Sequence, residues 1–499
     1  MNLTEKVLAL LSSFGYTGQS YAVIKHLEEN EMSKNEERGS FSGRLGFVLA
    51  AAASAVGLGN IWRFPYLAAK DGGGLFLLVY VILALTFGFT LLTTEIAIGR
   101  KSGKSPLQAY GTLCPKMNWI GAFACIIPAM ITPYYSSIGG WILKYMTTFV
   151  TGHGVEAAAD GYFTGFITSQ WSPIIWFVIY MALNIFVVFK GVNDGIEKMS
   201  KFMMPVLVIL IAGISIFSLT LEHTDASGIT RTGLEGFLVY VIPNFEGLTL
   251  KGFLNVLMDA MGQLFYSISV AMGIMVAYGS YVKKDTDLVK SVNQIEIFDT
   301  LVAFLAGMMI VPAVFTFMGT EGMAAGPSLM FVALPKVFQA MGGVGNVIGI
   351  IFFVTVSFAA LTSSVSLIEA ITSSVMDKWN MTRKKALTIV SVYIVVVGII
   401  VCLGYNVFYF DYTLPNGSVG QILDILDYVS NSLLMPIVSI ATCIMVGWMI
   451  KPKTIIEEVT RNGESFGRKG LYVVMIKFVT PIMLTLLLLQ ALGMLNWLK

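Results

Sequence analysis

Repeated apolar stretches, each long enough to cross a bilayer, constrain this chain more than any other feature. A transmembrane helix needs roughly 20 apolar residues. On that basis we expect eleven spans, centred at about residues 55, 87, 133, 181, 209, 268, 306, 359, 395, 435 and 483. Only 12% of the 499 residues are charged and 56% are hydrophobic, whereas soluble domains carry about 25% charged residues. The sequence therefore predicts an all-α integral membrane protein.

The residues that usually build metal or catalytic sites are sparse and scattered. The four cysteines and three histidines have no metal-ligand spacing and suggest no disulfide framework. An enzyme in the membrane would need a histidine, cysteine or carboxylate cluster at the membrane surface, and no such cluster is evident. We therefore expect no catalytic residues. The expected partners are the lipid bilayer and a small molecule, not nucleic acid, and the oligomeric state is left open.

The positions of lysine and arginine predict the orientation. When the N-terminus is placed in the cytoplasm, most of the 32 lysines and arginines fall in segments on that side, as the positive-inside rule requires. An odd number of spans then places Lys499 outside the cytoplasm. The apolar segment from Ser328 to Met341 contains Pro335 and Lys336, so we expect a re-entrant or surface hairpin there.

Two of the expected spans are interrupted. The first contains Gly57, Gly59 and Asn60, and the sixth contains Ser269 and Gly273. A break in a membrane helix exposes carbonyl groups that can bind a cation, and it leaves a helix N-terminus that favours an anion. Glycines on their own fit equally well a kink that serves helix packing.

The interrupted spans open two halves of similar length, and five spans per half give the halves opposite topology. We therefore expect a five-plus-five inverted repeat, the arrangement of many secondary transporters. The expected boundaries are a cytoplasmic tail (1–37), a first repeat (38–221), an extracellular loop (222–250), a second repeat (251–450), and a cytoplasmic loop with the eleventh helix (451–499).

Several separated motifs carry a resemblance to a known family. They are the run from Arg44 to Tyr66 with Gly72-Gly73-Gly74, Asp259-Ala260 with Gln263, and Leu361-Thr362-Ser363-Ser364. In this order they resemble the neurotransmitter:sodium symporter family, in particular its bacterial amino-acid transporters with eleven spans. The resemblance implies sodium-coupled amino-acid symport by alternating access in a prokaryotic plasma (inner) membrane.

The resemblance also implies two sodium sites. The first would use Ala55, Asn60, Ser267 and Asp299, where other members have an asparagine at the last position. The second would use Ala53, Val56, Ala359, Thr362 and Ser363. Both sets offer only oxygen atoms, which suit a hard cation.

The substrate site implied by the resemblance lies between the two breaks. Its residues would be Ala55, Leu58, Gly59, Ile131, Tyr135, Tyr266, Ser267, Ser269, Ala271, Met272, Ser364 and Leu367. No acidic residue stands at Ser54 or Ala55 to hold an amine that lacks a carboxylate. Relatives that carry such amines have an aspartate there, so its absence favours a full amino acid. The aromatic residues and methionine of the implied lining indicate a hydrophobic or aromatic L-amino acid.

Other functional roles are likewise implied by the resemblance. Chloride-dependent relatives hold an anion near Tyr80, Gln263 and Ser267. Asp299 would supply that negative charge here, so we expect independence from chloride. Glu95 would bind backbone groups freed by the breaks.

Gate residues are implied as well. They would be Arg63 with Asp427 on the outside, and Arg38, Tyr281 and Asp377 on the inside. We interpret Tyr134 as a packing residue, and no role is assigned to Glu369. A proton-coupled or exchange-type carrier of the same fold, or a non-transporting amino-acid sensor, remains an alternative.

Overall fold

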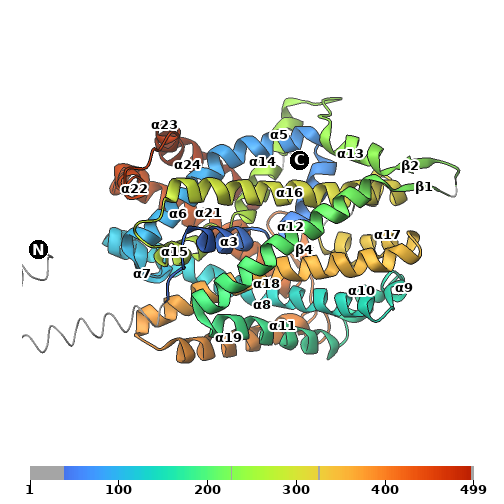
Figure 1. Ribbon diagram of the computed structural model, residues 1–499, viewed down its shortest axis with the longest axis horizontal. Coiled ribbons are helices and arrows are strands. Elements are labelled where there is room, and N and C mark those ends of the chain that lie inside the picture. Colours follow the sequence, from blue (N-terminus) through green and yellow to red (C-terminus); the bar gives the residue numbers. More distant parts are fainter. Residues whose placement is uncertain (1–38, 226, 324–325, 496–499) are drawn as a thin grey trace, which may run out of the picture.

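The computed structural model describes residues 39–225, 227–323 and 326–495, and this part of the chain is mostly helical (Figure 1). The expected tail and Arg38 lie outside the described residues. Nine helix runs in the described residues are long and apolar enough to cross a membrane. They are α5–α6 (Gly74–Ser102), η3–α8 (Pro115–Val150), α11 (Ser172–Phe189), η4–α12 (Val192–Leu219), α16 (Leu288–Met318), α18 (Gly343–Trp379), α19 (Arg383–Leu403), α20–η8 (Ile422–Met449) and α23–α24 (Lys469–Ala491).

Several of these runs are α-helices joined by short π-helical or 3₁₀ turns. The component elements are α5 (Gly74–Leu83), η2 (Ala84–Gly88), α6 (Phe89–Ser102), η3 (Pro115–Met117), α8 (Asn118–Val150), η4 (Val192–Glu197), α12 (Lys198–Leu219), α20 (Ile422–Asp427), η7 (Tyr428–Leu434), α21 (Met435–Ile444), η8 (Met445–Met449), α23 (Lys469–Val474), η9 (Met475–Val479) and α24 (Thr480–Ala491).

A tenth candidate span is broken where the sequence predicts it. Helix α3 (Arg44–Ala55) and the run formed by η1 (Gly59–Arg63) and α4 (Phe64–Lys70) meet at an angle of 54°. A Cβ at Gly57 would lie only 3.0 Å from the Ser363 hydroxyl, so the break approaches α18 closely because Gly57 has no side chain.

The second predicted break lies between α14 (Leu250–Ser267) and α15 (Ile274–Ser280). Ser269 and Ala271 have positive φ angles of 54° and 65°, so the backbone here cannot continue a right-handed helix. The Ala271 N–H donates to Glu95 Oε1 at 2.6 Å. This bond confirms that Glu95 binds backbone freed by the break.

The remaining elements lie mainly at the two ends of the helix bundle. The described residues contain two antiparallel hairpins, β1 (Glu222–Thr224) with β2 (Thr230–Thr232) and β3 (Tyr412–Thr413) with β4 (Val419–Gly420). Glu222 lies opposite Thr232 in the first. The short elements are α7 (Pro106–Leu113), α9 (Gly154–Ala157), α10 (Tyr162–Ile167), α13 (Gly233–Val241), η5 (Thr320–Gly322), η6 (Leu329–Ala333), α17 (Leu334–Ala340) and α22 (Lys453–Val459).

The segment expected to be a hairpin between spans is a short apolar helix, Leu329–Ala340. It is not long enough to cross a membrane, as expected, but it forms one continuous helix and not the expected hairpin.

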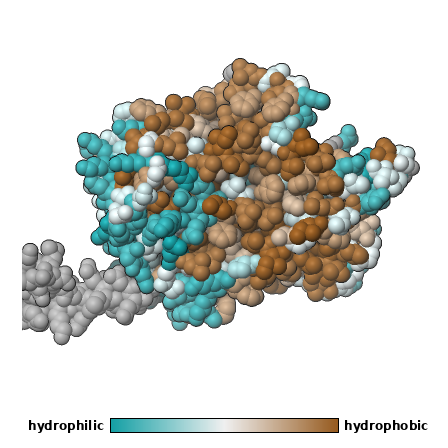
Figure 2. All heavy atoms as spheres, turned by 45° about the horizontal axis from the view of Figure 1, so that its top comes forward, coloured by the Kyte–Doolittle hydropathy of each residue, from teal (hydrophilic) through white to brown (hydrophobic). Residues whose placement is uncertain are grey.

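Most long helices run along the horizontal of Figure 1, and the short elements separate into two ends. One end carries β1–β2, α9 and α17, and we call it the hairpin end. The other carries α22 and α23, and we call it the α22 end. Between them the surface is broadly hydrophobic (Figure 2), with exposed side chains such as Phe202, Ile209 and Ile482. An apolar band of this kind suits a lipid environment and is unusual on a water-exposed surface.

Candidate functional site

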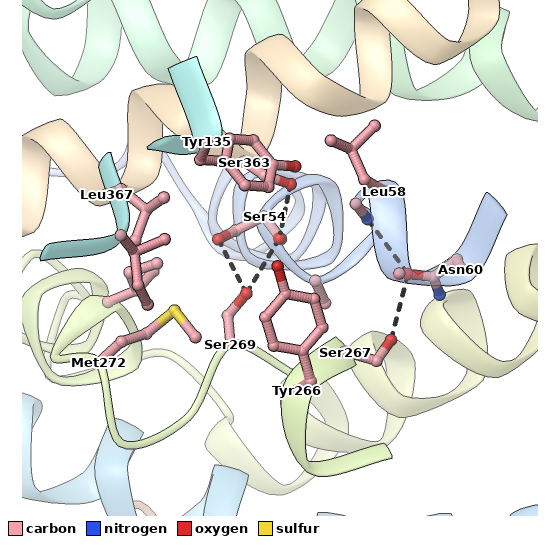
Figure 3. Close-up of a pocket in the computed structure, with 15 residues that line it drawn as sticks. Ser54, Leu58, Asn60, Tyr135, Tyr266, Ser267, Ser269, Met272, Ser363 and Leu367 are labelled. Carbon is pink, nitrogen blue, oxygen red and sulfur yellow. Dashed lines mark hydrogen bonds between the residues drawn. The ribbon is translucent and has the colours of Figure 1, made fainter. Parts of the chain in front are cut away.

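A narrow, mostly apolar cavity lies where the two breaks meet, near the centre of the bundle (Figure 3). It brings together α3, η1, the α14–α15 loop, α8 and α18. Its lining residues are Ser54, Ala55, Gly57, Leu58, Gly59, Asn60, Ile131, Tyr135, Tyr266, Ser267, Ser269, Met272, Ile274, Ser363 and Leu367.

One polar cluster beside this cavity joins side chains from four helical elements, η1, α5, α14 and α16. Ser267 Oγ lies 2.8 Å from Asp299 Oδ1 and 3.2 Å from Asn60 Oδ1. Asn60 Nδ2 donates to Asp299 Oδ1 at 3.0 Å, and Tyr80 Oη lies 3.4 Å from Asp299 Oδ2. Asp299 is fully buried, and within the described residues no lysine or arginine pairs with it. A buried carboxylate without a cation is costly, so the cluster is suited to bind one.

A second oxygen cluster lies between the end of α3 and the middle of α18. Ser363 Oγ lies 3.3 Å from the Val56 carbonyl oxygen, and Thr362 Oγ1 lies 3.1 Å from the Ala359 carbonyl oxygen. The break leaves the Val56 carbonyl outside the helix, so it can face the α18 hydroxyls. Ala53 is buried on α3 nearby in sequence, but no contact joins its carbonyl to this cluster.

The Tyr135 hydroxyl is the clearest unsatisfied group in the cavity. Tyr135 is 4% exposed, and its hydroxyl makes no hydrogen bond to any described residue. The Leu58 N–H and the Ser363 hydroxyl lie beside it. Because Leu58 and Gly59 open the helix run η1–α4, their N–H groups form a partial positive charge. Tyr135 and this helix start can therefore bind an anion together.

Two residues assigned to the substrate site by the resemblance do not line the cavity. Ser364 donates to Asn184 Oδ1 at 2.5 Å and bonds to Tyr180 on α11. The Ala271 N–H is bonded to Glu95 on α6. Ser54 and Ile274, by contrast, line the cavity without having been predicted. For Ser54 the signal was its position beside Ala55 at the end of the first apolar stretch.

Toward the hairpin end, Tyr135 and Tyr266 also line a second, wider cavity of about 580 Å³. Arg63 and Asp427 face this cavity, and no ion pair joins these two described residues. Asp427 instead accepts hydrogen bonds from Tyr134 at 2.9 Å and Asn431 at 2.6 Å. The interpretation of Tyr134 as a packing residue was therefore incomplete, because its hydroxyl binds a carboxylate that no sequence pattern connects to it.

The α22 end is closed by a different network. Glu369 is fully buried and receives two bonds from Arg383, at 2.6 and 2.8 Å, and one from Tyr281, at 2.6 Å. Asp377 accepts a bond from the Ser105 N–H at 2.7 Å. Tyr281 and Asp377 are thus both placed at this closure, and the role that the sequence left open for Glu369 is to anchor Arg383 and Tyr281.

The family model described as the sodium:neurotransmitter symporter family matches residues 38–155 and 165–497. The chain belongs to the sodium:neurotransmitter symporter family. The crystal structure of MhsT in complex with L-phenylalanine has a TM-score of 0.79, 33% identity, and covers 91% of this chain and 100% of that one.

Two further relatives share less of their sequence with this symporter. The uncharacterized sodium-dependent transporter YhdH of Bacillus subtilis is 32% identical over 467 residues, covering 92% of this chain and 98% of the relative. The human sodium- and chloride-dependent GABA transporter 2 is 26% identical and covers 74% of this chain and 67% of that protein.

Membership settles the broad properties of this symporter. It is a multi-pass secondary transporter of a small molecule and not an enzyme, and its family is sodium-dependent. The family resemblance drawn from the sequence is confirmed.

Proposed function

We propose that this symporter imports a hydrophobic or aromatic L-amino acid together with two sodium ions by alternating access, without a requirement for chloride. The observation that carries the proposal is the unsatisfied Tyr135 hydroxyl beside the N–H groups of the broken first helix. This is a ready site for the carboxylate of an amino acid.

The first sodium ion would bind Asn60, Ser267, Asp299 and the Ala55 carbonyl, next to the substrate carboxylate. The buried and unpaired charge of Asp299 supports this site. The second would bind Thr362, Ser363 and the carbonyls of Val56 and Ala359, with Ala53 completing the set. The 3.3 Å approach of Ser363 Oγ on α18 to the Val56 carbonyl at the end of α3 supports it.

The side-chain end of the cavity is apolar. Ile131, Met272, Ile274 and Leu367 line it, and a methionine can change shape to fit ligands of different size. The L-phenylalanine bound by MhsT is in keeping with such a pocket. The substrate ammonium would meet Ser269 and the carbonyls of Ala55, Tyr266 and Ser267.

Independence from chloride follows from the position of Asp299. Its carboxylate lies within 3.4 Å of Tyr80 and 2.8 Å of Ser267, where chloride-dependent members would hold the anion. A fixed negative charge there balances sodium and leaves no need for chloride.

The topology we propose has eleven spans. The helices α14 and α15 and the loop between them would form a broken sixth span, so that residues 38–221 and 251–450 are five-helix inverted repeats. The loop 222–250 would be extracellular and 451–499 would hold the last cytoplasmic loop and span. The α22 end would face the cytoplasm, with the N-terminus inside, the C-terminus outside, and the protein in the plasma (inner) membrane.

The proposal is tested by uptake in proteoliposomes, with the twenty amino acids competing against labelled L-phenylalanine. We expect uptake only with an inward sodium gradient, competition by apolar and aromatic amino acids, and no change when chloride is replaced by gluconate. Asp299→Asn should make the residual uptake chloride-dependent. Uptake driven by protons or by exchange alone would support the alternative carriers, and binding without uptake would support a sensor.

A further inference from the structure

The carbonyl of Ser54 has a role that neither sodium site nor substrate site assigns to it. Ser54 is the second-last residue of α3, so the residue that would normally donate to its carbonyl, Leu58, lies beyond the break. Two hydroxyls take that place. Ser269 Oγ and Ser363 Oγ each donate to the Ser54 carbonyl oxygen at 3.0 Å (Figure 3). A carbonyl oxygen has two lone pairs and can accept both bonds at once.

The bond from Ser363 to the Ser54 carbonyl orients the Ser363 hydroxyl for a cation. A hydroxyl has one proton to donate, and Ser363 has a second acceptor within reach, the Val56 carbonyl at 3.3 Å. When the proton points to Ser54, the lone pairs of Ser363 and the Val56 carbonyl both remain for an ion. When it points to Val56, it occupies one lone pair of that carbonyl and places a hydrogen between the two oxygens that would hold the ion. The Ser54 carbonyl therefore keeps this half of the second oxygen cluster in its cation-binding form.

The bond from Ser269 to the Ser54 carbonyl orients the Ser269 hydroxyl for an ammonium group. Ser269 has a φ angle of 54°, so its loop has no helix to fix it, and its contacts to Ser54 tie the loop to α3. These are the bond to the carbonyl and a longer approach of Ser54 Oγ at 3.4 Å. With its proton donated to Ser54, Ser269 presents its lone pairs to the cavity that it lines.

We propose that the Ser54 carbonyl is a positioning group that couples the second sodium site to the ammonium end of the substrate site. A carbonyl at a helix break can turn, and whichever ligand binds first fixes it through Ser363 or Ser269. The second ligand then meets a hydroxyl that is already oriented, so each ligand strengthens binding of the other, as linkage requires. This inference rests on the proposed function.

The test is sodium binding in the absence of any substrate, measured with ²²Na⁺ on purified protein. Ser269→Ala should raise the sodium concentration at half-saturation by about threefold, the effect of one lost hydrogen bond, although Ser269 is not a sodium ligand. Ser269→Gly should raise the sodium concentration at half-saturation to the same extent. It is a second variant that should not disturb folding, because glycine adopts a positive φ without strain.

The matched control is Val270→Ala. Val270 is buried in the same loop, does not line the cavity and has no hydroxyl, so it reports general loosening of the loop. It should leave the sodium midpoint unchanged. If the Ser269 variants and Val270→Ala give the same midpoint, or the Ser269 variants bind sodium more tightly, the coupling is contradicted. Absence of sodium binding by the unmodified protein would instead count against the proposed function.

Discussion

The two ends of the transport path use charged residues in opposite ways. At the hairpin end, Arg63 and Asp427 face a cavity of about 580 Å³ and do not pair with each other. At the α22 end, Glu369 is fully buried and bonded to Arg383 and Tyr281. We infer from this contrast a molecule that is closed at the α22 end and open at the hairpin end, with Tyr135 and Tyr266 lining both the central site and the wide cavity.

The α22 end has a second buried ion pair of the same kind. Arg100 on α6 donates to Glu458 on α22 at 2.8 Å, and their side chains are 0% and 4% exposed. Arg100 also donates to the Thr286 carbonyl at 2.6 Å in the loop after α15. Burying charges is costly unless they are paired and hydrogen-bonded. Such pairs hold one arrangement firmly, whereas exposed groups around a cavity can exchange partners easily.

The largest effect is expected from Arg383→Ala, which breaks the closed end. Removing one partner of a buried ion pair typically costs about 3–5 kcal/mol because the other charge is left uncompensated. Thermal unfolding in detergent should shift strongly downward and uptake should be lost. Replacing both residues, Glu369→Gln with Arg383→Gln, should recover much of the stability because no lone charge remains.

The control for this prediction is the exposed pair between Asp194 and Lys198, whose side chains are 65% and 69% exposed. Asp194→Asn should leave the unfolding temperature unchanged. An Arg383→Ala variant as stable as Asp194→Asn would mean that the buried network does not hold the α22 end closed.

A smaller effect, on rate more than on stability, is expected from Asp427→Asn at the open end. If Arg63 and Asp427 pair only when the wide cavity closes, removing the charge should slow uptake about fivefold, equivalent to roughly 1 kcal/mol. Substrate binding at equilibrium should change little. The comparison is initial uptake rate against binding affinity in the same preparation.

Tyr134→Phe serves as the partner experiment, because it removes a hydrogen bond from Asp427 but keeps the charge. It should slow uptake less than Asp427→Asn does. Equal slowing by both variants would assign the effect to the hydrogen bond and not to pairing with Arg63.

The smallest effect concerns Asp71, which follows α4 and lines a further polar cavity with Asp259 and Lys70. Burial, followed by the negative charge of Asp259, raises the pKa of Asp71 from 3.8 to about 7. The folded protein therefore binds more protons than the unfolded chain between these values. The stabilisation from this group is complete below pH 3.8 and is lost as the pH rises through about 7.

Between pH 5 and pH 8 the unfolding temperature should consequently fall by about 2 °C more in the unmodified protein than in Asp71→Asn. Identical pH profiles would show that Asp71 does not titrate in this range. The same comparison with Asp194→Asn should leave the profile unchanged.

Local patterns were sufficient to predict most of the helices and the two breaks. Ten of the expected spans correspond to the nine long runs and the bent pair, because apolar length and glycine placement are local properties. The grouping of Asn60, Ser267 and Asp299 followed from the resemblance, and the structure brings the three side chains within hydrogen-bonding distance. Ser364 and Ala271 are not among the residues that line the cavity, because moving one residue along a helix or loop changes the face on which a side chain lies.

By itself the sequence determined a helical membrane protein with two interrupted helices and oxygen-rich positions near each break. Only the tertiary structure decided which backbone carbonyls are freed at the breaks and which hydroxyl groups bind them. Ser54 and Ser363 are 309 residues apart, and Ser54 and Ser269 are 215 apart, so no local pattern joins them. The same holds for Glu369 on α18 and Tyr281, which directly follows α15. Whether such a hydrogen bond forms depends on differences of a few tenths of an ångström in the donor–acceptor distance. Those distances are set by how the helices pack and not by the residues of any one segment.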